Sequence, residues 1–272
     1  MNENKKIGII GGGQMAEALI KGFLKKKLFS AENILVSEPV EERRKYLEKS
    51  YKITTTKSNV EVVKKIEIIL LAVKPQVMKK VLEEISPHIN PEKHLILTIA
   101  AGIPINFYEK LLPPQTKVIR IMPNTCALVH QAISGISKGS FATDEDLKVA
   151  ENIFSAIGET ILVEENLMDA ITSLSGSGPA YVALFIEALI DGGVRAGLPR
   201  HVAEKLALQT VLGTVKLMLE TGKNPYEVKS MVTSPAGTTI TAMQEFYEKG
   251  LPGIIISGIY KAYLRAKELS KV

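Results

Sequence analysis

The sequence predicts an α/β protein in which a doubly wound, parallel sheet with helices on both faces is followed by an all-helical region. Through about residue 164, short apolar runs alternate with amphipathic helical patterns, which is typical of such a sheet. Beyond that point, almost every apolar pattern has helical spacing. The segment SGSGPAY, residues 175–181, lies close to the change. We therefore expect one domain over residues 1–164 and a helical domain over residues 165–272.

The composition indicates a cytoplasmic protein. The 272 residues are 46% hydrophobic, which is enough to bury a core in one large domain or two ordinary ones. The longest apolar run, residues 66–73, is too short to span a bilayer, and the start MNENKK lacks the apolar region of an export signal. A single cysteine, Cys126, excludes an internal disulfide framework. We therefore expect no association with a membrane.

Charge and histidine spacing argue against nucleic-acid and metal binding. The net charge of +5 is modest and the basic residues are scattered, so we expect no nucleic-acid partner. A basic surface of this strength still attracts an anionic cofactor mildly. The four histidines, His88, His94, His130 and His201, do not have metal-ligand spacing. We expect no metal site.

Seven short apolar runs in the first half are predicted to be strands. They cover residues 5–10, 33–37, 67–73, 95–99, 118–122, 133–137 and 160–163. A helical pattern at residues 144–157 separates the last two runs. Either Ser58 or Asn59 is expected to cap a helix over residues 60–64.

A glycine-rich turn joins the first strand to a helix. Gly11 permits a tight turn, Gly13 lets a pyrophosphate approach the backbone, and Ala16 is small enough for helix and strand to pack closely. The N–H groups at the start of the helix would bind the phosphates. An ordinary glycine-rich turn is the alternative, but the flanking strand and helix favour dinucleotide binding.

The second strand ends at Ser37 and Glu38, where dinucleotide-binding folds place an acid on the adenosine ribose. A carboxylate there accepts hydrogen bonds from both ribose hydroxyls and repels a 2′-phosphate by about 1 kcal/mol or more. Arg43 and Arg44 follow and would favour the phosphate, but a solvated helix face explains them better. Glu38 therefore favours NADH.

Two further loops are expected at the same edge of the sheet. Pro75 cannot extend a central strand, so the chain turns after Val73 and Lys74. The fourth strand opens into Ala100-Ala101-Gly102, whose small side chains either leave room for a flat ring or simply pack closely.

The helical domain is expected to form a homodimer. Long helical patterns cover residues 181–198, 202–220 and 253–268, and residues 180–190 are apolar nearly all round. A helix of that kind must be buried on all sides, and a partner subunit is the natural cover. Glu164 and Glu165, just before it, are best explained by a solvated helix start, and contact with a substrate amine is the alternative.

The stretch TSPAGTT, residues 233–239, precedes another helical pattern. Backbone N–H groups and hydroxyls gathered at a helix start bind a carboxylate well. A plain helix cap made by a threonine is the alternative, and local sequence alone favours it.

Together these motifs resemble the pyrroline-5-carboxylate reductase family. The resemblance rests on GGGQMAEAL (11–19), AVKPQ (72–76), AAGI (100–103), RIMPNT (120–125), LMDAITSLSGSGPAY (167–181), DGGVRAGLPR (191–200) and TSPAGTTI (233–240). It implies an N-terminal Rossmann domain that binds NADPH or NADH and a C-terminal helical dimerisation and substrate-binding domain. It also implies dimers that assemble into larger rings.

The resemblance assigns roles to individual residues. It implies coenzyme contacts at Gly11, Gly13, Gln14, Met15, Asn59, Val73, Lys74 and Ala101. It implies that Ser234, Gly237, Thr238 and Thr239 bind the substrate carboxylate from the partner subunit. Thr239 is the catalytic candidate, as an orienter of the imine nitrogen or of a water. The chain departs from the family at Ala236, where a glycine is usual, and at Glu38, where a small polar residue is usual in members that prefer NADPH.

The implied reaction is hydride transfer to the imine of 1-pyrroline-5-carboxylate, giving L-proline. A protonated imine is already electrophilic, so the site needs placement more than a strong acid. A β-hydroxyacid dehydrogenase would need a lysine early in the helix after the segment SGSGPAY, to handle an alcohol proton, and none occurs there before Lys205. A non-catalytic dinucleotide sensor would need the coenzyme turn but not a carboxylate-binding loop, so the presence of residues 234–239 argues against it.

Overall fold

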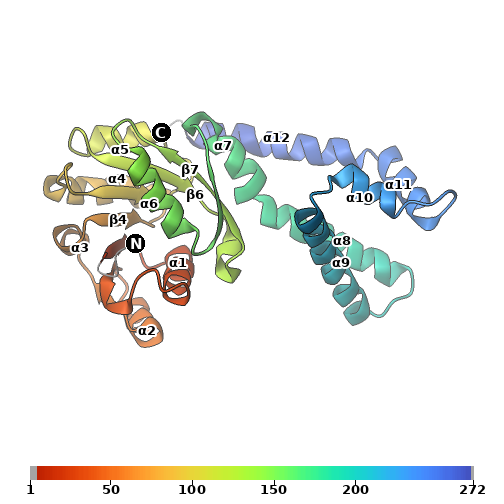
Figure 1. Cartoon of the computed structure of the whole chain (residues 1–272), viewed down its shortest axis with the longest axis horizontal. Coiled ribbons are helices and arrows are strands. Elements are labelled where there is room, and N and C mark those ends of the chain that lie inside the picture. The colour runs from red at the N-terminus through yellow and green to blue at the C-terminus, as the bar shows by residue number, and fades with distance from the viewer. Residues whose placement is uncertain (1–4, 271–272) are drawn as a thin grey trace. The chain divides into compact units, whose positions relative to one another are not determined.

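A computed structural model describes residues 5–270, so that part of the N-terminal stretch MNENKK, residues 1–4, lies outside the described residues. Among the described residues the chain forms an eight-stranded sheet (Figure 1). The strands are β1 Ile7–Ile10, β2 Ile34–Ser37, β3 Thr54–Thr56, β4 Ile68–Leu71, β5 Leu95–Thr98, β6 Lys117–Met122, β7 Ala132–Lys138 and β8 Gly158–Leu162.

The helices of the first half connect these strands. They are α1 Gln14–Lys25, α2 Glu41–Tyr51, α3 Asn59–Lys65, α4 Pro75–Ile85, α5 Ile105–Leu111 and α6 Asp144–Phe154, with the 3-10 turns η1 Ala31–Asn33, η2 Ser86–His88, η3 Thr125–Val129 and η4 Glu165–Leu167. The second half is helical throughout: α7 Met168–Ile171, the π-helical turn η5 Thr172–Gly176, α8 Gly178–Arg195, α9 Arg200–Thr221, α10 Pro225–Met231, α11 Thr238–Glu248 and α12 Leu251–Leu269.

The strand order is β3-β2-β1-β4-β5-β6-β7-β8, which confirms a doubly wound sheet. After β1 the chain first builds outward to β3 and then returns to place β4 on the other side of β1, so the switch point lies between β1 and β4. The expectation of a wholly parallel sheet is wrong at one place, because β6 and β7 pair antiparallel. The short link through η3 is the reason: a parallel crossover needs a dozen or more residues.

Two apolar clusters cover the two faces of the sheet. One joins α1 and α6 to the strand residues Ile7, Ile9 and Val36. The other joins α3, α4 and α5 to Ile10 and Leu71. Because both faces are covered, all four residues of β2 are buried, and not only the alternate positions expected from its pattern.

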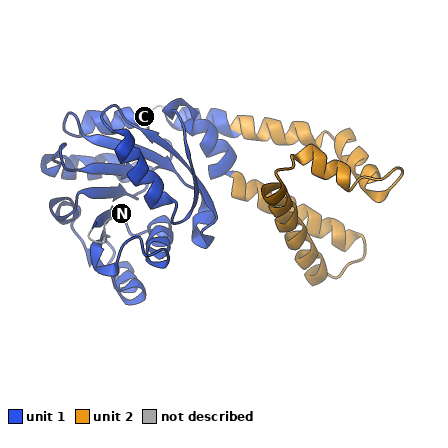
Figure 2. Cartoon of the chain, viewed as in Figure 1, with its two compact units in different colours: residues 1–177, 262–272 blue, residues 178–261 orange. Residues whose placement is uncertain are grey.

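The chain divides into two compact units (Figure 2). The first contains residues 1–177 and 262–272, and the second contains residues 178–261. This division differs from the sequence-based boundary between residues 164 and 165, because η4, α7 and the last part of α12 belong to the sheet unit. In the second unit, the main packing of one helix against another is that of α8 against α9.

The helical run Glu165–Arg195 is long and apolar enough, by length and composition alone, to cross a membrane. Apolar side chains of α8 are exposed in the single chain, including Leu184 at 67% and Val182 at 49%. In the described part of the chain no residue of α8 is fully buried, although the helix packs against α9. An apolar helix of this kind needs a cover from outside the chain.

Candidate functional site

The residues expected to bind a coenzyme lie at the carboxyl ends of adjacent parallel strands. Gly11 follows β1, Glu38 follows β2, Val73 and Lys74 follow β4, and Ala101 follows β5. Since β2, β1, β4 and β5 are neighbours, these loops gather at one edge of the sheet, at its switch point. Ligands of open α/β sheets bind in this kind of crevice.

Gly11 makes the turn that begins the crevice. Its φ of +100° lies in the left-handed region that favours glycine. A Cβ at Gly11 would lie 2.7 Å from the carbonyl oxygen of Ala72 and 2.9 Å from Val73 Cγ1. The Gly11 N–H donates to the carbonyl of Ser37 (2.8 Å), which ties the turn to the end of β2.

Gly13 leaves open space above the start of α1. It is the N-cap of α1, and within the described residues no side chain caps the helix. A Cβ built on Gly13 would meet no atom within 4 Å. Gln14 is exposed and Met15 half-buried beside it, while Ala16 packs fully buried against the sheet. This open, uncapped helix start fits the diphosphate of a dinucleotide.

Glu38 lies directly on the glycine-rich turn. Its Oε2 accepts a hydrogen bond from the Gly12 N–H (2.9 Å), and its Oε1 accepts one from the Val40 N–H (3.0 Å). The carboxylate is therefore fixed beside the crevice, at the place where a ribose is expected.

The two arginines of α2 are engaged with backbone carbonyls, unlike the solvated helix face considered from the sequence. Arg43 donates to the carbonyls of Gly12 (2.6 Å) and Gly13 (3.2 Å) and forms an ion pair with Glu17. Arg44 donates to the carbonyls of Glu38 (2.7 Å) and Pro39 (2.9 Å). Both guanidinium groups thus stabilise the loops that border the crevice.

Ser37 and Asn59 form a second polar pair at this edge. The Ser37 hydroxyl donates to Asn59 Oδ1 (2.7 Å), and Asn59 Nδ2 donates to Glu84 (2.9 Å). Ser58, not Asn59, caps α3 by accepting from the Glu61 N–H. Asn59 is therefore free of the capping role that the sequence left open.

The loop after β5 contains one closely packed alanine and one open alanine. Ala100 is packed in the core at 4% exposure, whereas Ala101 is exposed. Ala101 and Gly102 line a cavity of about 450 Å3 together with Pro75 and Gln76. The base of the loop is fixed by Tyr108, whose hydroxyl lies 2.6 Å from Thr98 Oγ1. Burial raises the pKa of Tyr108 to about 12, so this hydroxyl stays protonated.

The candidate substrate loop lies in the second unit. Gly237 is the N-cap of α11, and within the described residues no side chain caps this helix, so the threonine cap favoured by local sequence is wrong. Thr238 and Thr239 form its first turn. A Cβ on Gly237 would lie 2.3 Å from Ser234 Oγ, so a larger residue there would require the Ser234 hydroxyl to turn away. The uncapped amides fit a carboxylate.

The segment SGSGPAY begins in a π-helical turn, Thr172–Gly176, that the sequence did not predict. Such turns are frequent at functional sites. Asn124, just after β6, donates through Nδ2 to the Ser175 carbonyl (3.3 Å). Within the described residues, Ser175 Oγ is buried without a hydrogen-bond partner. Pro179 lies in the first turn of α8, as expected.

Curated relatives match the whole chain. The chain is 46% identical over 269 residues to a pyrroline-5-carboxylate reductase of Methanosarcina acetivorans, covering 99% of both proteins. It is 46% identical to that of a Synechocystis species over 266 residues, covering 98% of both. The chain belongs to the pyrroline-5-carboxylate reductase family. Residues 165–269 match the family model described as pyrroline-5-carboxylate reductase dimerisation, and residues 6–102 match that of NADP oxidoreductase, coenzyme F420-dependent.

Solved structures of pyrroline-5-carboxylate reductases share the fold. The enzyme of Coxiella burnetii gives a TM-score of 0.93 at 33% identity, covering 98% of this chain and 99% of that one. The Plasmodium falciparum enzyme, solved with NADP bound, gives 0.89 at 30% identity, covering 99% of both. The sheet unit of this reductase is thus a Rossmann-type domain, and residues 165–269 belong to a dimerisation domain.

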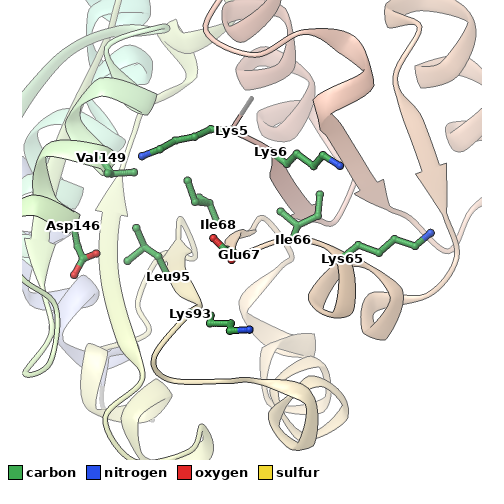
Figure 3. A pocket seen from close by; sticks show the side chains of 10 residues that line it. All are labelled: Lys5, Lys6, Lys65, Ile66, Glu67, Ile68, Lys93, Leu95, Asp146 and Val149. Carbon is green, nitrogen blue, oxygen red and sulfur yellow. The ribbon is translucent and has the colours of Figure 1, made fainter. Parts of the chain in front are cut away.

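A second cavity of about 430 Å3 lies at the opposite edge of the sheet. Lys6, Glu67 and Lys93 precede β1, β4 and β5, so this cavity lies at the amino ends of the strands. Figure 3 shows its lysine ammonium groups pointing in different directions and not toward a common point. It therefore lies away from the loops that carry the candidate coenzyme residues. Among the described residues, no cluster of three or more acidic, histidine or cysteine side chains has the arrangement of a metal site.

Proposed function

We propose that this chain reduces 1-pyrroline-5-carboxylate to L-proline with NADPH or NADH. The proposal is supported most by one observation: the uncapped, open start of α1 lies at the switch point of the sheet in a chain that matches reductase relatives along its whole length. When bound, the coenzyme supplies the hydride.

The chain's own residues provide placement. The proposed coenzyme contacts are Gly11, Gly13, Gln14, Met15, Ser37, Glu38, Asn59, Val73, Lys74 and Ala101. Of these, Gly13 offers the open helix start to the diphosphate, and Ala101 offers a small surface next to a cavity. Holding two reactants in the correct geometry supplies much of the catalytic effect in a reaction of this kind.

The substrate carboxylate is proposed to bind at residues 234–239. The N–H groups of Thr238 and Thr239 stand at the start of α11, while the Gly237 N–H donates to the Ser234 carbonyl (3.1 Å) and holds the turn together. The positive end of the helix dipole adds to their attraction for an anion. Thr239 is proposed as the catalytic residue that orients the imine nitrogen or a water. Its hydroxyl positions a proton and does not act as a free acid at neutral pH.

The reductase is proposed to act as a homodimer in the cytoplasm. The exposed apolar surface of α8 lies within the match to the dimerisation family, so a second copy is the natural cover. We propose that each subunit receives its substrate loop from the partner and that dimers assemble into larger rings. Sedimentation at micromolar concentration should give a dimer or a larger assembly, and a stable monomer would contradict this part of the proposal.

The function is tested by adding 1-pyrroline-5-carboxylate to the full-length protein with NADH or NADPH and measuring coenzyme oxidation together with L-proline formation. Both should occur in equal amounts. A Thr239→Ala variant should lose activity. The control is Thr214→Ala, which changes an exposed threonine in the middle of α9 and should keep activity. Coenzyme oxidation without L-proline, or full turnover and affinity in Thr239→Ala, would contradict the proposal.

A further inference from the structure

A buried arginine lies beneath the coenzyme edge of the sheet. Arg120 is in the middle of β6 and is only 3% exposed. It pairs in register with Thr98, the last residue of β5. A buried guanidinium is costly unless carboxylates and hydrogen bonds satisfy it, so its partners indicate what it holds in place.

Glu165 is one partner of Arg120, and it also holds the start of α5. Its Oε1 accepts from Arg120 Nη1 (3.2 Å) and from the Ile105 N–H (2.6 Å). Ile105 begins the helix that follows the loop carrying Ala101. Glu165 is therefore not part of a solvated helix start. One of its oxygens links β6 to the end of the loop that carries Ala101, residues 99–104, which we call the coenzyme loop.

Asp169 is the second partner of Arg120, and it also holds the end of α12. Its Oδ1 lies 3.8 Å from Arg120 Nη2 and accepts a hydrogen bond from the Ser270 hydroxyl (2.8 Å). Within the described residues Arg120 Nη2 has no hydrogen-bond partner, so the pair with Asp169 is an ion pair alone. Asp169 belongs to α7, which runs directly into the π-helical turn Thr172–Gly176.

Arg120 and its partners are thus linked to the two segments through which the chain passes from one compact unit to the other. The chain leaves the first unit after Ser177, a few residues beyond Asp169, and returns to it at Ala262, within the helix that ends beside Ser270. The loop carrying Ala101 is held by the same group through Glu165. Through its two carboxylate partners, Arg120 is therefore linked to the start of α5, to α7 and to the end of α12.

We propose that Arg120, through Glu165 and Asp169, is a positioning residue for hydride transfer. It fixes the coenzyme loop on one side and the two segments that lead to the substrate-binding helices on the other. The inference rests on the proposed function. Neither carboxylate needs to touch the substrate, because both act through the backbone segments that they hold.

Three variants test the proposal by kcat, by KM for 1-pyrroline-5-carboxylate and by coenzyme Kd from NAD(P)H fluorescence. Glu165→Ala removes the acceptor of the Ile105 N–H and should lower kcat about tenfold and weaken coenzyme binding. Glu165→Gln keeps an acceptor oxygen and should recover most of that loss. Ser270→Ala releases the end of α12 and should raise the substrate KM about fivefold while coenzyme Kd stays unchanged.

Lys117→Met is the matched control, because it breaks another ion pair of β6, with Asp146 at 3.6 Å, at the opposite end of the strand. It should leave all three constants within about twofold of the wild type, the scatter expected of a surface pair. Wild-type constants in Glu165→Ala and Ser270→Ala, or losses no larger than those of Lys117→Met, would overturn the inference. A wild-type protein that forms no L-proline would instead overturn the proposed function.

Discussion

Glu38 is the single residue on which the choice of coenzyme most depends. Both of its oxygens are fixed by backbone N–H groups, those of Gly12 and Val40, so the carboxylate cannot easily turn away from a ligand in the crevice. Arg43 is paired with Glu17 and with loop carbonyls, so its charge is partly neutralised. A 2′-phosphate would therefore meet a fixed negative charge without a free guanidinium close by.

Replacing Glu38 with serine should shift the preference from NADH toward NADPH. The change removes about 1 kcal/mol or more of repulsion, so the ratio of kcat/KM for NADPH to that for NADH should rise about fivefold or more. Steady-state kinetics with each coenzyme measure this ratio. Glu42→Ser, an exposed neighbour in α2, should leave it unchanged. A wild-type enzyme that strongly prefers NADPH would refute the role given to Glu38.

Ala236 is strained where the family usually has glycine. Its φ is +55°, in the left-handed region that costs a residue with a Cβ roughly 1–2 kcal/mol. Ala236→Gly removes that cost but adds freedom to the unfolded chain, which offsets part of the gain. We expect the free energy of unfolding in urea to rise by about 0.5–1 kcal/mol. A measurable loss of stability would show that Ala236 makes contacts that outweigh the strain.

At the scale of elements, Glu17 joins α1 to α2 next to the glycine-rich turn. Its carboxylate accepts from Tyr46 (2.8 Å), Tyr51 (2.7 Å) and Arg43. Partial burial raises the pKa of Glu17, but the hydrogen bonds from Tyr51, Arg43 and Tyr46 outweigh it and leave this pKa below its ordinary value. Glu17 therefore stabilises the fold when it is ionised.

The contribution of Glu17 should disappear in acid. A carboxyl whose pKa is lowered by folding stabilises above its unfolded pKa, and the effect is lost as the pH falls through the folded pKa. The difference in free energy of unfolding between wild type and Glu17→Gln should thus be largest near neutral pH and shrink below about pH 4. Urea unfolding across this range measures it, with the exposed Glu41→Gln as control. A difference that does not depend on pH would contradict this account.

The order of most elements could be predicted from the sequence because apolar periodicity and turn residues mark them. The exceptions have physical reasons. The edge strand Thr54–Thr56 has only three residues, and none of them is fully buried, so it gives little apolar signal. The antiparallel pairing of β7 depended on the length of a link, which periodicity does not report. A π-helical turn differs from an ordinary α-helical turn by one residue in its hydrogen-bond spacing, and the apolar pattern does not reveal that difference.

The candidate site was predictable where one residue type is required and not where long-range partners decide. Gly11 could be identified, because its positive φ and the nearby Ala72 carbonyl leave room only for glycine, whereas Gly237 was assigned through the family resemblance. The network of Arg120 was missed, because Glu165, Asp169 and Ser270 are distant in sequence. The available signal was a lone arginine inside the apolar strand VIRIM.

For the whole molecule, the account requires that a coenzyme held by the sheet unit and a carboxylate held by residues 234–239 react in one assembly. The most direct test uses NADH or NADPH that carries deuterium on the transferred position, with 1-pyrroline-5-carboxylate and the full-length protein. The account predicts L-proline with one deuterium at the former imine carbon, detected by mass spectrometry. Unlabelled L-proline, or no L-proline at all, would contradict it.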